Sequence, residues 1–168
     1  MLFKKFFIVF FLQFLLFAND FDYKSFKTDF EQIVYDNQNV LKYSGTIYYK
    51  DNKSLWEYKK PDEKLVYITK EEVLVVDKEL EQVVISKENI NLQEILKKLI
   101  KIDENMYLAK YEDTEYLVKT NKKFINTIDY KDDLGNKVKI IFTNSIVNNN
   151  INDKIFEYKI PSNYDIIR

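Results

Sequence analysis

Residues 43–61 read YSGTIYYKDNKSLWEYKKP and contain the clearest strand pattern in the chain. Over residues 43–50 the side chains alternate in character, which suits a strand with one face turned inward. A polar turn follows, and residues 55–59 alternate again before a proline ends the run. The stretch therefore predicts an antiparallel hairpin, with Trp56 and Tyr58 on one face of its return strand.

Further segments of the same character extend this hairpin into a large sheet. We expect strands at residues 64–69, 73–77, 81–86, 107–111, 115–119, 125–131, 137–143 and 155–160. Charged turns separate most of them, and Asp132–Asn136 is the clearest hairpin turn. About ten short strands at this spacing predict a large antiparallel sheet that curls on itself.

Two segments have the period of an amphipathic helix instead. The first begins at Ser25, and its apolar face includes Phe26 and Phe30. The second spans Asn91 to Ile100, and its apolar face consists of Leu92, Ile95, Leu96, Leu99 and Ile100. The expected fold class is therefore α+β, mainly antiparallel β, with two helices available to cover the sheet.

The N-terminus has the pattern of a secretory signal peptide. Lys4 and Lys5 precede an apolar run over residues 6–17, and Ala18 is a small residue before a polar start. The run is shorter than the about 20 residues that a membrane helix needs, although an uncleaved anchor is the alternative. We expect a signal peptide over residues 1–18 and one domain over residues 19–168.

The composition argues against several classes of function. The chain has no histidine and no cysteine, which removes the usual nucleophile–base pairs and the soft metal ligands. With only Gly45 and Gly135, it cannot form a glycine-rich phosphate loop. The 26 basic residues are interleaved with 27 acidic ones, so no nucleic-acid partner is indicated. We expect no enzyme, no cofactor and no metal site.

Acidic pairs provide the alternatives to that expectation. The pair Asp132-Asp133 with Asn136 is a conceivable calcium site, since hard cations take oxygen ligands. Paired acids can also catalyse glycoside hydrolysis when they face each other across a cleft. All such pairs in this chain fall in predicted turns, where solvated charge is the ordinary interpretation, so a plain hairpin turn is favoured.

Five short motifs follow one another along the chain. They are Phe26-x-x-x-Phe30-x-Gln32, Ser44–Tyr48, Trp56–Pro61, Asp77 followed by Glu81–Val83, and Phe156–Pro161. Their order and spacing resemble those of the LolA family of outer-membrane lipoprotein carriers over nearly the whole chain after the signal peptide. The resemblance implies a curled, half-open β-barrel with covering helices that form a lid over a hydrophobic cavity.

The resemblance also implies a function and a site. It implies a periplasmic chaperone that binds the acyl chains of lipoproteins released from the inner membrane and carries them to the outer membrane. Its partners would be lipoproteins, an inner-membrane ABC transporter, and an outer-membrane acceptor or the membrane itself, and the protein would be a monomer. A periplasmic regulator or another lipid-binding module of the same fold is the alternative.

Nine residues are expected to build this site, and an ordinary packed core residue is the alternative for each. Those expected to line the acyl-binding cavity or its lid are Ile47, Tyr49, Trp56, Tyr58, Leu92, Leu96 and Leu99. Phe26 and Phe30 are expected to pack the N-terminal helix against the sheet.

Overall fold

The computed structural model describes residues 21, 23–36, 39–87, 92–121 and 124–168, without the side chains of residues 92–94. The expected signal peptide lies outside the described residues. The elements are β1 (Ser25–Tyr35), β2 (Val40–Lys50), β3 (Lys53–Lys60), β4 (Lys64–Ile68), β5 (Val73–Asp77), β6 (Gln82–Ser86), α1 (Leu92–Lys97), β7 (Ile100–Asp103), β8 (Met106–Tyr111), β9 (Thr114–Asn121), β10 (Phe124–Lys131), β11 (Lys137–Val147), η1 (Asp153–Phe156) and β12 (Asp165–Ile167).

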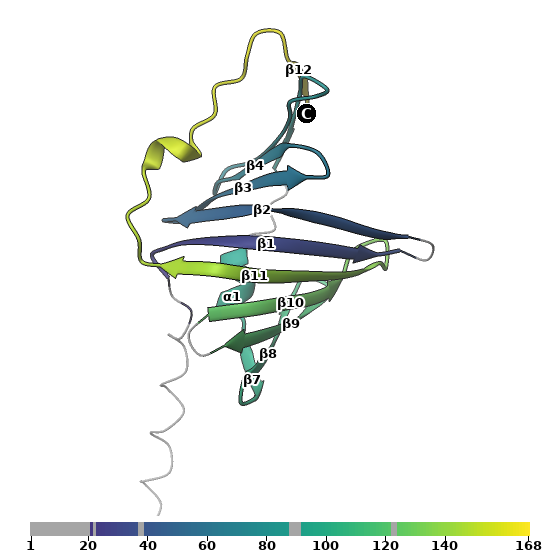
Figure 1. Cartoon of the computed structure of the whole chain (residues 1–168), viewed down its shortest axis with the longest axis vertical. Helices are drawn as coiled ribbons and strands as arrows, with labels where there is room; N and C mark the ends of the chain where they lie inside the picture. Colours follow the sequence, from purple (N-terminus) through teal and green to yellow (C-terminus); the bar gives the residue numbers. More distant parts are fainter. Residues whose placement is uncertain (1–20, 22, 37–38, 88–91, 122–123) are drawn as a thin grey trace, which may run out of the picture.

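The strands form one open, twelve-stranded sheet rather than a closed barrel. Its order is β12-β6-β5-β4-β3-β2-β1-β11-β10-β9-β8-β7, and the sheet fans out from β12 to β7 in Figure 1. Neighbouring strands are antiparallel except β12, which runs parallel to β6. The predicted hairpin of β2 and β3 is confirmed, with Ile47 opposite Trp56 and Gly45 opposite Tyr58.

The predicted N-terminal helix is wrong, because residues 25–35 form β1 at the centre of the sheet. Phe26 and Phe30 are four residues apart, a spacing that puts them on one side of either a helix or a strand. The β-branched and aromatic residues at the end of this segment favour a strand. Pairing with β2 on one side and β11 on the other supplies hydrogen bonds that an isolated helix could not match.

The second helix is confirmed but shorter than expected. The described α1 covers Leu92–Lys97, and Asn91 lies outside the described residues. The Lys98 amide bonds to the Ile95 carbonyl, a tight turn that ends the helix. Ile100 is therefore not on a helical face but begins the edge strand β7, which the pattern did not predict.

The strand expected at residues 155–160 is also wrong. The chain there forms the short helix η1, capped by the Asn152 side chain, and then runs without regular structure to β12. The Lys50 ammonium holds this segment by donating to the Ile151 carbonyl at 3.1 Å and to Asp153 at 2.9 Å. We call residues 148–164 the C-terminal segment, and Figure 1 shows it passing outside the sheet between β11 and β12.

Each face of the sheet carries its own hydrophobic core. The face on which α1 packs, called the helix face, holds a cluster that includes Phe30, Ile47, Ile95 and Ile128. The opposite face of β3–β6 holds a second cluster in which Leu55, Tyr67, Val76 and Val83 meet Ile151 and Phe156 of the C-terminal segment. The C-terminal segment therefore supplies the cover that a sheet face needs when its side chains are apolar.

Gly45 lets two parts of the helix face approach closely. A Cβ atom at this position would lie 2.0 Å from the Glu57 carbonyl oxygen and 2.9 Å from Cε1 of the Phe30 ring. The pairing of β2 with β3 shifts its register between Ser44 and Gly45, so the backbone is already irregular here. The ring of Phe30 occupies the room that a side chain would have taken.

We predict that Gly45→Ala lowers the free energy of unfolding by about 2–3 kcal/mol, because the methyl group forces the backbone of β3 or the Phe30 ring to move. Urea unfolding followed by circular dichroism measures the change. Gly135→Ala is the matched control. That glycine has φ +82 but open space around its Cβ position, so we expect only the conformational cost of about 1 kcal/mol. Equal losses in the two variants would contradict the close approach at Gly45.

Candidate functional site

The structure brings six of the predicted site residues together on the helix face. Ile47 is fully buried, Tyr49 is buried, and Trp56 and Tyr58 are half-buried. Phe26 and Phe30 join them from β1, because β1 lies beside β2 in the sheet. We call these six residues, Phe26, Phe30, Ile47, Tyr49, Trp56 and Tyr58, the aromatic cluster.

Ring contacts hold the aromatic cluster in a fixed arrangement. Phe26 stacks on Tyr49 with ring centroids 5.0 Å apart. The Phe30 ring meets Trp56 edge-on at 5.3 Å and Tyr58 at 5.0 Å. Such pairs add about 0.5–1.5 kcal/mol each beyond the burial of their area. The cluster is therefore a rigid, apolar floor on the helix face.

The leucines predicted to form a lid lie on or just after α1. Leu96 is 6% exposed and Leu99 is half-buried against the core of the helix face. The backbone of Leu92 is helical, but its side chain lies outside the described residues. Ile95, which was expected on the same helical face, enters the core cluster.

An apolar surface that the sequence analysis missed continues the aromatic cluster across β4, β5 and β6. The pairing places Val66 opposite Trp56, Val75 opposite Val66, and Val84 opposite Val75, so all share the helix face. The next row on this face contains Ile68 and Val73. We call Val66, Ile68, Val73, Val75 and Val84 the apolar band.

Within the described part of the chain, the apolar band packs against no buried residue of either core. Its five side chains are half-buried and belong to neither core cluster. The opposite face of the same strands is covered by the C-terminal segment. A signal for this surface exists in the sequence, since strands such as Val73–Asp77 are apolar on both faces, which is typical of strands that are covered on both sides.

A polar row borders the apolar band on one side. The register aligns Tyr58 with Lys64, Lys64 with Asp77, and Asp77 with Gln82. The Lys64 ammonium lies 3.2 Å from the Asp77 carboxylate. The backbone amide of Leu80 donates to that carboxylate, and with Lys64 it holds the pKa of Asp77 below its usual value. The Lys64–Asp77 pair stays charged, so it marks where the apolar surface ends.

Tyr58 connects the polar row to the interior of the helix face. Its hydroxyl donates to Oε1 of Gln32 on β1 at 3.1 Å. Burial raises the pKa of Tyr58 well above its usual value, with a further contribution from the neighbouring Tyr130 phenol. Burial likewise raises the pKa of Tyr130 to about 12. Both phenols are therefore neutral hydrogen-bonding groups at physiological pH.

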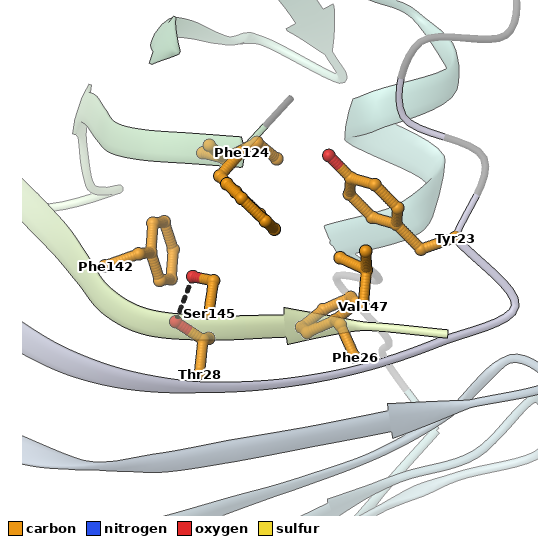
Figure 2. Close-up of a pocket in the computed structure, with 8 residues that line it drawn as sticks. Tyr23, Phe26, Thr28, Phe124, Phe142, Ser145 and Val147 are labelled. Carbon is orange, nitrogen blue, oxygen red and sulfur yellow. Dashed lines mark hydrogen bonds between the residues drawn. The ribbon is translucent and has the colours of Figure 1, made fainter. Parts of the chain in front are cut away.

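A small cavity lies at the other end of β1, between β1, β10 and β11. Its volume is about 30 Å³, and Figure 2 shows Phe26, Phe124, Phe142 and Tyr23 around it. The hydroxyl groups of Thr28 and Ser145 meet at 2.7 Å in its wall. The cavity has room for about one water molecule, so it is not the site of a long apolar ligand.

The turn between β10 and β11 settles the interpretation of its acidic pair. Oδ1 of Asp132 accepts the backbone amides of Leu134 at 3.0 Å and Asn136 at 2.8 Å. Oδ2 accepts the Asn136 side-chain amide at 3.0 Å. The predicted hairpin turn is confirmed, and both oxygens of this carboxylate are used within it. Over the described residues, no three acidic side chains gather as metal ligands, and no helix is long and apolar enough to cross a bilayer.

Known proteins resemble this chain over most of its length. The family model described as outer membrane lipoprotein carrier protein LolA matches residues 22–117. The outer-membrane lipoprotein carrier protein of Campylobacter jejuni is 42% identical over 98% of this chain and 99% of its own length. Its counterpart from Helicobacter pylori strain P12 is 33% identical over 86% of this chain and 80% of its own.

A solved structure shares the fold at much lower identity. The crystal structure of a LolA superfamily protein from Nitrosomonas europaea matches with a TM-score of 0.50 and 8% identity, over 84% of this chain and 94% of that one. The strand-rich architecture therefore agrees with the relationship that the sequence comparisons establish. This chain belongs to the LolA family.

Proposed function

We propose that this protein is a periplasmic carrier that binds the acyl chains of lipoproteins released from the inner membrane and delivers them to the outer membrane. Relatives that cover nearly its whole length carry the name outer-membrane lipoprotein carrier protein. The structural observation that supports the proposal is the apolar band, which extends the aromatic cluster and lies half-buried outside both cores of the described residues. The role is binding rather than catalysis.

The size of the hydrophobic effect explains why such a surface suits this cargo. Each buried CH₂ group contributes about 0.8 kcal/mol, so an acyl chain of roughly 16 carbons costs on the order of 12 kcal/mol to leave in water. Strands in a sheet are about 4.8 Å apart, so the band and Trp56 together extend about 14 Å across β3 to β6. A chain laid across these strands would bury much of its length.

The proposed acyl site combines the apolar band with the residues predicted from the sequence. Ile47, Tyr49, Trp56 and Tyr58 form its floor, and Phe26 and Phe30 support that floor from β1. Leu92, Leu96 and Leu99 form its lid, which α1 brings over the helix face. Because Leu96 is buried without cargo, opening would exchange its protein contacts for contacts with cargo.

We further propose the partners that this role requires. Residues 19–168 act as one domain that travels as a monomer after removal of the signal peptide. An inner-membrane ABC transporter supplies the lipoprotein, and an outer-membrane acceptor or the membrane itself receives it.

We predict that Val75→Glu weakens binding of a dipalmitoylated lipopeptide at least 10-fold, because a carboxylate in the apolar band must be desolvated when an acyl chain covers it. Fluorescence titration of the purified mature protein measures the affinity. Lys70→Ala is the matched control, since it changes the net charge by the same amount at an exposed turn. Unchanged affinity in a folded Val75→Glu protein would remove the apolar band from the site.

The lid is tested by the rate of binding rather than by its strength. We predict that Leu96→Ala speeds both entry and release of a fluorescent acyl probe by about 10-fold or more, because truncating a buried leucine removes about 2–5 kcal/mol of packing that holds α1 closed. Stopped-flow fluorescence gives both rates, and Lys97→Ala, exposed on the same helix, is the control. Lower stability with unchanged rates would show that Leu96 is a permanent core residue.

A further inference from the structure

Three side chains on the helix face place hydrogen-bonding groups where the apolar surface ends. Gln32 and Tyr58 are joined by the hydrogen bond described above. Tyr130 stands on the same face in the next row, since it lies opposite Val138, which pairs with Val34 of β1. All three are half-buried. They come from β1, β3 and β10, so the central part of the sheet holds them in fixed positions. We call Gln32, Tyr58 and Tyr130 the polar end of the site.

The polar end holds more donors than it uses. Tyr58 donates to Oε1 of Gln32, which leaves the Gln32 amide nitrogen with two protons to donate. Within the described part of the chain, neither that nitrogen nor the Tyr130 hydroxyl makes a hydrogen bond. In the empty protein these half-buried groups can reach water, but a ligand that covers them removes that water and must supply a hydrogen-bond partner instead.

The position of Tyr58 connects these donors to the acyl surface. Its ring stacks on Trp56 with centroids 6.5 Å apart and an interplanar angle of 22°. Trp56 in turn lies opposite Val66, the first residue of the apolar band. A ligand that lies along the band and over Trp56 therefore brings its next atoms to Tyr58 and Gln32.

The chemistry of the polar end selects the kind of group that fits there. Its free groups are neutral donors, and the ammonium of Lys64, which lies opposite Tyr58 in the sheet, is already paired with the Asp77 carboxylate. A neutral group that only accepts hydrogen bonds completes such a set, whereas a carboxylate or a phosphate would lose its hydration without gaining an unpaired cation. The carbonyl oxygen of an ester is an acceptor of this kind, and esters join acyl chains to a glyceryl group.

We propose that the polar end of the site donates hydrogen bonds to an ester carbonyl of the cargo, and thereby fixes the direction in which a bound acyl chain lies. This inference rests on the proposed function. The ester and its glyceryl group lie at Tyr58 and Gln32, and the hydrocarbon runs from there over Trp56 into the apolar band. Gln32 and Tyr130 are binding residues that distinguish an acyl ester from an alkyl chain of the same length.

The test compares two ligands that differ only in the carbonyl groups. One is a dipalmitoyl-glyceryl cysteine peptide, and the other is its dihexadecyl ether counterpart, titrated against the purified mature protein. We expect the ester to bind about 3- to 10-fold more tightly, which is the range for one hydrogen bond. In Gln32→Leu this preference falls to about one, while the affinity for the ether is kept.

Two further variants keep the test decisive if Gln32→Leu does not fold. Tyr130→Phe removes one hydroxyl group and keeps its ring, and we expect it to reduce the ester preference. Tyr48→Phe is the matched control, because Tyr48 packs with the core of the opposite face, and we expect it to keep the full preference. A ¹³C-labelled ester carbonyl should also absorb at lower infrared frequency when bound to the wild type than when bound to Gln32→Leu.

The outcomes separate this inference from the proposed function. Equal affinity for the ester and the ether in the wild type would overturn the proposal that the polar end binds the ester. The polar end would then hold only water, and the proposed acyl site would be unaffected. Failure of both ligands to bind would overturn the proposed function and the polar end with it. A preference that persists unchanged in folded Gln32→Leu and Tyr130→Phe would assign the ester to other residues.

Discussion

The pairing of β1 on both of its edges is the constraint on which the rest of the structure depends. β1 joins the half of the sheet that runs through β2 to β6 to the half that runs through β11 to β7. Its alternate side chains Phe26, Phe30 and Gln32 therefore stand at the centre of the helix face. A slip of one residue in either ladder would turn all of them to the other face, so the aromatic cluster and the polar end exist only in this register.

The two faces of the sheet have different roles because different segments cover them. On the opposite face the C-terminal segment closes the core with Ile151 and Phe156. On the helix face α1 covers the centre, and the surface beyond Trp56 is half-exposed. Because β3–β6 are covered on one face, the core there maintains these strands while part of their other face stays open.

The sequence predicts this architecture well where the pattern is local. The alternation around Ile47 and Trp56 identified both the hairpin and four residues of the aromatic cluster. Phe26 and Phe30 fit a helix as well as a strand, and only pairing with strands distant in sequence decides between them. The apolar band could not be located from the pattern, because its members meet through register across β4, β5 and β6. Gln32 and Tyr130 were missed for the same reason.

The strands that carry the apolar band keep their structure when no cargo is bound. On the opposite face, Leu55, Tyr67, Val76 and Val83 of these strands pack against the C-terminal segment. This packing does not depend on what occupies the helix face. If the apolar band is the acyl site proposed above, loading and unloading do not require its strands to unfold. In the proposed delivery cycle the acyl site is therefore still formed after the cargo leaves, so one molecule can bind cargo repeatedly without refolding.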